Sequence, residues 1–439
     1  MDAATLAEIR NGVGEGTAML RSHAIMCAMV NGLKYLPGRV PATRLGACCE
    51  GVDVLIVGAG MSLHEHADEV KERAKSSLVF AVNTAAPRLA QMGVPIDLLV
   101  SIEAVDTSEQ LRASAGNVAA YCIDVAAHDN VWRAAIDSGK PVLWSACQTA
   151  HGMEVLDALE VQPVYMGGAA VTCAAALAYQ WGARSIGLVG IDCARADGQT
   201  YAPGTAWGAL RFGWGKTDDE KAETRIVYTG TEERDALHDR CGIARIPNVR
   251  KPYPWPCNDG TEGFTTAEIL DQFLWFSEWR AGLRRDVHCW TIADRGARID
   301  GWTTERPAPG PGGLSVGFLD RFVRTPYDGW IGDDASDVPE TTPAQIESLR
   351  DLLRQQAADC ERIAEEMIAG RFDYAAGGKH GVVDGLMSGR IMRDRAGDGM
   401  SLHEQWIGAY TVMRNAAREL TALISEQDAE TSGAINGVS

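Results

Sequence analysis

Short apolar runs that alternate with stretches of helical character limit the fold of this 439-residue chain more than any other feature. The six runs lie at 52–57, 78–82, 97–102, 118–123, 141–144 and 185–190. Nearly all their side chains are apolar, which is typical of strands buried on both faces, as in a parallel sheet. The helical stretches between them lie at 64–75, 85–92, 130–138 and 169–181. This alternation predicts a doubly wound α/β domain with a mostly parallel sheet.

The segments outside the repeating pattern differ from it in composition. Residues 1–49 are predicted to form an N-terminal helical segment, and the α/β core is expected to span 50–302. Within the core, 196–265 is rich in glycine, tryptophan and charge, which predicts a long excursion over the carboxyl edge of the sheet. A linker rich in proline and glycine is predicted over 303–342. Apolar residues at helical spacing then predict a C-terminal helical region with a hairpin over 343–439.

Charge and cysteine content exclude several classes of protein. The chain carries 41 Lys and Arg against 59 Asp and Glu, a net charge of −18, which argues against non-specific binding of nucleic acid or anionic membranes. No apolar run is long enough to span a membrane, and the N-terminus lacks the pattern of a secretory signal. The 11 cysteines form no CxxC pair. We therefore expect a cytoplasmic protein with reduced thiols, no metal site and no permanently bound cofactor.

Two glycine-rich segments precede predicted helices. Gly58 and Gly60 follow the first strand, and Ser62 can cap the next helix. Glycine lets the backbone approach a ligand, and the free N–H groups at a helix start favour phosphate. Gly167 and Gly168 stand in the same way before an alanine-rich helix. The alternative for Gly58 and Gly60 is a tight turn that binds no ligand, and the alternative for Gly167 and Gly168 is close packing of the helix on the sheet. The carboxyl edge of such a sheet is, however, the usual place for a ligand site.

Polar side chains follow several of the predicted strands. Asn83 follows the second strand and can contact a base or a ribose, or cap a helix. Glu103 follows the third strand and can act as a base, bind ribose hydroxyls or cap the next helix. Asp192 ends the sixth strand, a usual place for an acid or base, and Tyr201 follows on a turn. Asp97 opens the third strand, far from this edge, so we expect a structural role for it.

These glycine-rich and strand-end segments, in this order and spacing, resemble the MptE-like family, which includes 6-hydroxymethylpterin diphosphokinases and the motility-associated factor (Maf) glycosyltransferases. The matching sequences are VLIVGAGMSL at 54–63, AVNTAAPRLAQMGVPIDLLVSIE at 81–103 and GGAAVTCAAALAYQWGARSIGLVGIDCARADGQTYAPGT at 167–205. A later segment at 261–279 is similar to the region that closes the family's core. The resemblance implies a Rossmann-like core that binds a nucleotide-activated donor.

The resemblance also implies roles for individual residues. The residues expected to face the donor phosphate are Gly58, Gly60, Ser62, Gly167, Gly168 and Thr172. Asn83 and Glu103 would contact the nucleotide or act near the reacting carbon. Asp192 would be the base or would position the acceptor, and Tyr201 completes the predicted catalytic group.

Three hypotheses about function follow. In Maf proteins the expected donor is a CMP-activated nonulosonic acid, and the acceptor is a hydroxyl of a protein. For this chain the sequence allows either a protein hydroxyl or a small-molecule hydroxyl as the acceptor. In the pterin kinases ATP donates diphosphate, and Mg²⁺ is held by acidic residues after the third strand. This chain has Ser101-Ile102-Glu103-Ala104 there, and one carboxylate is a poor cradle for Mg²⁺ on a triphosphate. Sugar transfer is therefore the first hypothesis, the diphosphokinase the second, and a binding or scaffold protein the third.

Overall fold

A computed structural model describes most of the chain. The residues described are 25, 28–45, 48–146, 159, 161, 164, 167–195, 197–216, 224–241, 248–283, 286–308, 341–368, 418, 421, 422, 424 and 425. Their main feature is a seven-stranded sheet with the order β12-β6-β1-β2-β3-β4-β5. All its neighbouring strands pair in parallel. This arrangement confirms the predicted doubly wound α/β class.

The strands of this sheet follow the apolar runs of the sequence, with one addition. They are β1 (Asp53–Val57), β2 (Leu78–Val82), β3 (Ile96–Ser101), β4 (Val118–Asp124), β5 (Val142–Ser145), β6 (Ser185–Val189) and β12 (His288–Thr291). The first six correspond to the six predicted runs. Strand β12 was not predicted, because its sequence HCWT is short and has no apolar periodicity. It becomes a strand by pairing with β6, from Ser185 to Leu188.

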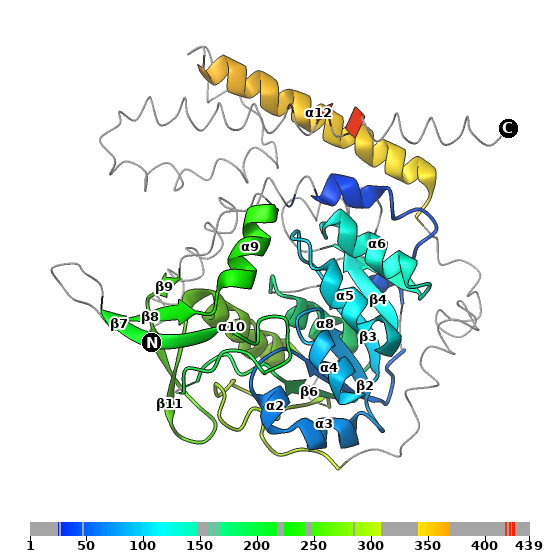
Figure 1. Ribbon diagram of the computed structural model, residues 1–439. Coiled ribbons are helices and arrows are strands. Elements are labelled where there is room, and N and C mark those ends of the chain that lie inside the picture. The colour runs from blue at the N-terminus through cyan, green and yellow to red at the C-terminus, as the bar shows by residue number, and fades with distance from the viewer. Residues whose placement is uncertain are drawn as a thin grey trace.

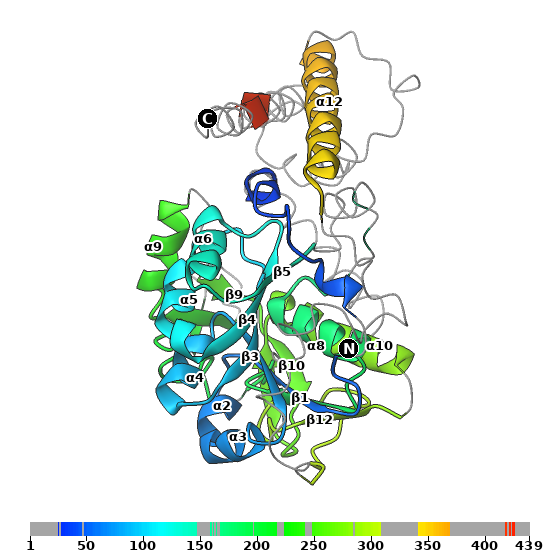
Figure 2. The same cartoon turned by 90° about the vertical axis from the view of Figure 1, so that its right-hand side faces the viewer.

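Helices cover both faces of the sheet, as Figure 2 shows. One face carries α2 (Ser62–Glu65), α3 (Ala67–Arg73), α4 (Ala86–Met92), α5 (Ser108–Ser114), the 3₁₀ turn Ala115–Asn117 and α6 (Asp129–Asp137). The other face carries the 3₁₀ turn Ala42–Arg44, α8 (Ala170–Gln180) and α10 (Ala267–Gly282). Each layer buries its own apolar cluster against the sheet, which explains why the strands are apolar on both sides.

The segment between β6 and α10 leaves the sheet and forms smaller elements. Its antiparallel sheet consists of β7 (Arg211–Lys216), β8 (Thr224–Thr229) and β9 (Val249–Arg250), and helix α9 (Glu232–Arg240) lies between β8 and β9 in the chain. The hairpin of β10 (Tyr253–Pro256) and β11 (Glu262–Thr265) follows. These elements lie to the left of the central sheet in Figure 1. The Ala202 N–H donates to Ala59 O at 2.8 Å, and the Ala206 N–H donates to Thr84 O at 3.1 Å. The segment therefore crosses the carboxyl ends of β1 and β2.

The C-terminal part contributes one long helix, α12 (Pro343–Ile368), at the top of Figure 1. Its residues Ile346, Leu349 and Leu353 are buried in the cluster that also holds α4 to α6. No helix within the described ranges is long and apolar enough to cross a membrane. The predicted N-terminal helices before residue 25, most of the predicted linker, and most of the second helix of the predicted C-terminal hairpin lie outside the described residues.

Asp97 has the structural role expected from its place at the start of β3. It is buried, and its carboxylate accepts the N–H of Val79 at 2.8 Å. Burial raises the pKa of Asp97 to about 7, although the hydrogen bond from Val79 favours the charged form. The side chain thus links β2 and β3 at the edge opposite the carboxyl ends.

Candidate functional site

The carboxyl ends of β1 and β6 form the topological switch point of the sheet. From β1 the chain builds the sheet outward through β2 to β5, and it then returns to place β6 on the other side of β1. In open α/β sheets, ligands bind in the crevice outside the strands at such a point. Three predicted site residues, Gly58, Gly60 and Ser62, follow β1 here, and Asp192 follows β6.

The two loops at this switch point are joined directly by hydrogen bonds. The Gly58 N–H donates to Val189 O and the Gly60 N–H donates to Gly190 O, each at 2.7 Å. The Ser62 hydroxyl accepts the N–H of Gly190 at 2.8 Å. The amides of Gly58 and Gly60, which the resemblance directs toward a phosphate, are thus already donated within the protein. We call this arrangement of residues 58–62 and 189–192 the β1–β6 junction.

Asp192 lies inside the β1–β6 junction. Its side chain is 4% exposed, and Oδ2 accepts the N–H of Ser62 at 3.0 Å. Its Oδ1 is buried and has no hydrogen-bond partner among the described residues; the Arg195 Nη1 is 4.0 Å away. Burial raises the pKa of Asp192, and the charge of Arg195 only partly opposes this effect. A Cβ at Gly60 would lie 2.2 Å from Oδ2, so close packing on Asp192 requires glycine there.

Sequence reasoning missed Arg195, a buried cation beside Asp192. Its Nη2 donates to Glu65 Oε1 at 2.8 Å and to Asp197 Oδ2 at 2.5 Å. Arg295 reaches the same two carboxylates, at 3.3 and 3.2 Å. The hydrogen bond from Arg195 holds the pKa of Glu65 below its ordinary value. The available signal was the alternation of opposite charges in Asp192-Cys193-Ala194-Arg195-Ala196-Asp197, directly after a strand.

A second group of polar residues lies at the carboxyl end of β3. Tyr201 is half-buried; burial raises its pKa, the charge of Glu103 raises it further, and the charge of Arg234 opposes the shift. Burial, and then the neighbouring Tyr201, raise the pKa of Tyr228 to about 12. Two of the three predicted catalytic residues, Glu103 and Tyr201, are therefore close enough for the charge of one to act on the other. Asp192 is placed apart from them, in the β1–β6 junction.

Helix α9 brings Arg234 to this end of β3. Leu237 packs on Val105, in the loop that follows Glu103. The Asp106 N–H donates to the sulfur of Cys241 at 3.4 Å, which ties the end of α9 to the same loop. Arg234 was not predicted from the sequence, because nothing local indicates that a helix more than 100 residues after β3 lies against its end.

Several buried polar groups near β3 lack partners. Ser101 Oγ and Thr107 Oγ1 are buried and have no hydrogen-bond partner among the described residues, and neither does Thr200 Oγ1, next to Tyr201. Buried polar atoms of native proteins are nearly always bonded, so such a group indicates a place where a water or a ligand binds. The predicted site residue Asn83 is also buried, and it donates to Gln110 Oε1 at 2.7 Å, which links β2 to α5.

The start of α8 contains the remaining predicted residues. The Thr172 hydroxyl accepts the N–H groups of Gly167 at 3.1 Å and Ala169 at 3.2 Å, and it donates to Ala169 O at 2.7 Å. A Cβ at Gly167 would lie 2.5 Å from Trp275, so packing accounts for that glycine. Gly168 is exposed, has a φ of +75° and faces open space. Because α8 runs antiparallel to the strands, its N-terminus lies at the carboxyl edge of the sheet.

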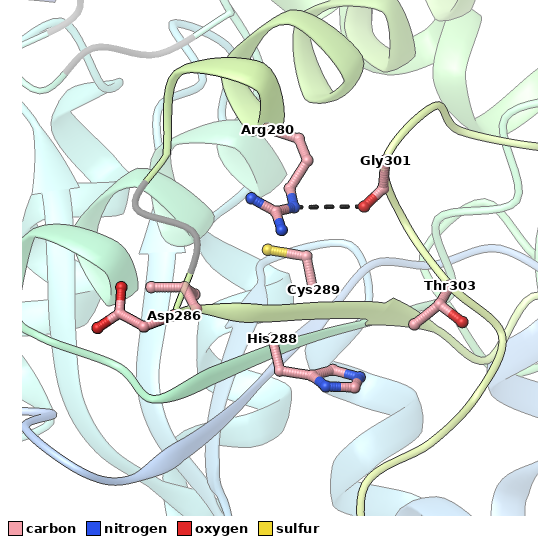
Figure 3. A pocket seen from close by; sticks show the side chains of 7 residues that line it. Arg280, Asp286, His288, Cys289, Gly301 and Thr303 are labelled. Atoms are coloured by element: carbon pink, nitrogen blue, oxygen red, sulfur yellow. Dashed lines mark hydrogen bonds between the residues drawn. The ribbon is translucent and has the colours of Figure 1, made fainter.

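A separate pocket lies at the other edge of the sheet, beside the start of β12. It has a volume of about 260 Å³ and is lined by Arg280, Asp286, Val287, His288, Cys289, Gly301 and Thr303. In Figure 3 the guanidinium of Arg280 faces the sulfur of Cys289, and its Nε donates to Gly301 O at 3.2 Å. Because His288 pairs with Ser185, the first residue of β6, this pocket is not part of the carboxyl-edge site. The described part of the chain contains no group of three His, Cys, Asp or Glu side chains that can hold a metal.

Comparisons with known proteins agree with this fold. A Maf glycosyltransferase from Magnetospirillum magneticum AMB-1 has a similar structure, with a TM-score of 0.53 and 13% sequence identity over 93% of this chain. The alignment spans 58% of the length of that protein, and at this identity it shows a shared fold. The comparison with curated proteins found no match. Residues 28–198 match the family described as 6-hydroxymethylpterin diphosphokinase MptE-like, and the family resemblance predicted from the sequence is thereby confirmed over that segment.

Proposed function

We propose that this protein is a glycosyltransferase of the Maf type, which transfers a sugar from a nucleotide-activated donor to a hydroxyl acceptor. A CMP-activated nonulosonic acid is the first donor to test. The observation that carries the proposal lies at the carboxyl end of β3, where Ser101 Oγ and Thr107 Oγ1 are buried without partners among the described residues and Glu103 follows the strand. The charges of Glu103 and of Arg234, on α9, both act on Tyr201. A carboxylate, a phenol and a guanidinium within electrostatic reach of one another are groups that can activate a hydroxyl and stabilise an anionic leaving group. The fold shared with a Maf glycosyltransferase supports it.

The transfer step assigns one role to each of these side chains. The Glu103 carboxylate takes the proton of the acceptor hydroxyl as its oxygen bonds to the anomeric carbon. The bond between that carbon and the phosphate oxygen breaks, and the nucleotide leaves with its phosphate. The pKa of Tyr201 is raised by burial and by Glu103, so the phenol stays protonated at neutral pH and donates a hydrogen bond to the departing phosphate. Arg234, which also pairs with Asp235 at 3.1 Å, adds a guanidinium whose charge acts on Tyr201.

The start of α8 is the proposed place for the donor phosphate. An α-helix of 11 residues carries a partial positive charge at its N-terminus, and Gly168 leaves open space beside it. In this assignment Gly168 keeps the role expected from the sequence. The N–H of Gly167 and the hydroxyl of Thr172 are bonded to each other and shape the turn before the helix. Gly58, Gly60, Ser62 and Asp192 act indirectly, because they hold the loop to which the segment with Tyr201 is bound.

A pterin-type diphosphokinase is the second candidate, since the matching family bears that description. It needs carboxylates that can hold Mg²⁺ on a triphosphate. Asp106, which follows β3, accepts the N–H of Ser108 at 3.1 Å and the side-chain amide of Asn130 at 2.6 Å. Asp192 accepts the N–H of Ser62 and faces Arg195. With Asp106 and Asp192 engaged inside the protein, and Asp192 apart from Glu103, the residues present fit Mg²⁺ poorly.

Nucleotide binding and product formation distinguish the candidates. We expect CMP, or another nucleotide released from a sugar donor, to raise the melting temperature, because a ligand that binds only the folded state stabilises it. Incubation with the CMP-activated sugar and an acceptor should then release CMP. Magnesium-dependent release of AMP from ATP with a hydroxymethylpterin would establish the kinase instead. Failure of cytidine, uridine, guanosine and adenosine nucleotides alike to stabilise the protein would favour a scaffold without chemistry.

A further inference from the structure

Arg195 is a buried cation that the transfer step above does not use. Its side chain is 4% exposed, yet it binds Glu65 from α2 and Asp197 from the start of the excursion. Burial opposes the charge of Arg195, but the bonds to Asp197 and Glu65 outweigh burial and raise the pKa of its guanidinium. A charge removed from water is costly unless it is paired and fully bonded, so this placement requires a fixed arrangement of its partners.

The backbone around Arg195 is held at several points. Its N–H donates to Phe264 O at 3.3 Å and its carbonyl accepts from the Phe264 N–H at 3.0 Å, which joins it to β11 at the far end of the excursion. The carbonyl of Asp192 accepts the N–H groups of Ala194 at 2.6 Å and Ala297 at 2.7 Å. Cys193 between them has a φ of +58°, a strained value for a residue other than glycine. Such strain persists only where the surrounding structure holds the residue firmly.

A short path of contacts leads from Arg195 to Tyr201. Asp197, which Arg195 binds, also accepts the N–H of Gln199 at 3.2 Å through Oδ1. On the other side of Tyr201, Ala202 donates to Ala59 O at 2.8 Å, within the β1–β6 junction. Tyr201 therefore lies between two fixed points of the chain, the Arg195–Asp197 pair before it and the Ala202–Ala59 hydrogen bond after it. Glu65 of α2 also binds Arg195, which ties the first of these points to the helix that follows Ala59.

We propose that Arg195 is a positioning residue, which fixes the segment that carries Tyr201 by binding Asp197 and Glu65 at the same time. The planar fork of arginine can satisfy two carboxylates in a fixed geometry, which the single ammonium of lysine cannot do. Its importance for transfer rests on the proposed function. The placement of Tyr201 itself is a property of the free protein and can be measured without any substrate.

The test compares Arg195→Met with Arg184→Met in the full chain without ligand. Arg184 pairs with Asp53 at 2.7 Å at the amino end of the sheet, so its loss removes an arginine–aspartate pair far from Tyr201. We expect amide exchange in residues 197–205 to become about tenfold faster in Arg195→Met and to stay unchanged in Arg184→Met. Unchanged exchange in 197–205 of folded Arg195→Met would overturn the proposal.

A spectroscopic measurement separates positioning from a general loss of stability. With ¹³C-labelled tyrosine, and the Tyr201 resonance identified from Tyr201→Phe, the phenol can be titrated under native conditions. Release of Tyr201 in Arg195→Met should bring its pKa back toward the ordinary value of 10.0, while Arg184→Met should leave it raised. A Tyr201 pKa that stays raised in Arg195→Met would show that Arg195 has only a structural role.

Milder variants keep the proposal testable if Arg195→Met does not fold. Asp197→Asn removes the charge that Arg195 binds but keeps an oxygen for the N–H of Gln199. Arg195→Lys keeps the charge without the fork. Both should change exchange in 197–205 and the Tyr201 titration in the same direction, to a smaller extent, and wild-type behaviour in both would overturn the proposal. Because no nucleotide is present, these results do not depend on whether the protein is a transferase.

Discussion

The β1–β6 junction and the carboxyl end of β3 lie on the same edge of the sheet, but their polar groups are satisfied to different degrees. In the junction, Gly58, Gly60 and Ser62 donate their N–H groups to other parts of the protein, and glycine is needed because there is no space for a Cβ. One junction atom, Asp192 Oδ1, lacks a hydrogen-bond partner among the described residues, and the charge of Arg195 lies 4.0 Å from it. At the end of β3, Ser101 Oγ and Thr107 Oγ1 are buried without partners among the described residues. The glycine pattern therefore marks close packing here, and unmet hydrogen-bonding capacity marks the better candidate for ligand binding.

The largest expected effect concerns the chemistry at the end of β3. Glu103→Gln keeps the shape of the side chain but cannot accept a proton, and we expect transfer to slow by about 10²- to 10⁴-fold. Binding of the nucleotide should persist, as measured by thermal shift. Glu109→Gln, an exposed residue on α5, is the matched control and should keep full activity. Full activity in Glu103→Gln together with a large loss in Asp192→Asn would move the reaction to the junction.

At the amino end of β3, opposite the candidate site, the buried carboxylate of Asp97 should make stability depend on pH. Its pKa is raised to about 7, so the folded protein binds a proton more tightly than the unfolded chain. The stability from this proton is present below the unfolded pKa of 3.8 and is lost as pH rises through about 7. Relative to the wild type, Asp97→Asn should therefore gain stability between pH 4 and 8, by up to about 4 kcal/mol. Urea unfolding at several pH values measures this gain, and a constant difference would contradict it.

Close packing of the junction predicts a large cost for a single methyl group. In Gly60→Ala the new Cβ would lie 2.2 Å from Asp192 Oδ2 and 2.9 Å from Gly190 O, and we expect a loss of about 3 kcal/mol in the free energy of unfolding. Gly116→Ala is the control, because nothing lies within 4 Å of a Cβ there. Equal stability of the two variants would mean that the junction has space for a ligand after all.

The smallest effect tests the unpartnered hydroxyls. Thr107→Val removes a buried hydroxyl that has no partner in the described structure, so the ligand-free protein should be as stable as the wild type or up to about 1 kcal/mol more stable. Thr205→Val removes a hydroxyl that donates to Ala202 O at 2.7 Å, and it should cost about 1 kcal/mol. Chemical denaturation measures both. Destabilisation of Thr107→Val equal to that of Thr205→Val would show that the Thr107 hydroxyl is already bonded, for instance to a buried water.

Much of the fold could be predicted from local sequence patterns, but less of the candidate site could. Six strands were predicted because apolar runs report burial on both faces, whereas β12 depends on pairing with β6 and has no local pattern. Glu103 was selected because it follows a strand and Tyr201 because it lies on a turn, but the sequence did not indicate that the charge of one acts on the other. Arg195 and Arg234 were missed, since their partners come from distant segments.

The sequence by itself determined the class of fold, the order of the first six strands along the chain, and the structural role of Asp97. These depend on hydrophobic periodicity and on position within one strand, which are local properties. Only the tertiary structure decided that the glycine turn closes on β6, that Arg195 is buried between two carboxylates, and that Tyr201 lies within reach of the charge of Glu103. Each of these depends on which distant segments lie side by side, and the packing of helices and loops on the whole sheet determines this.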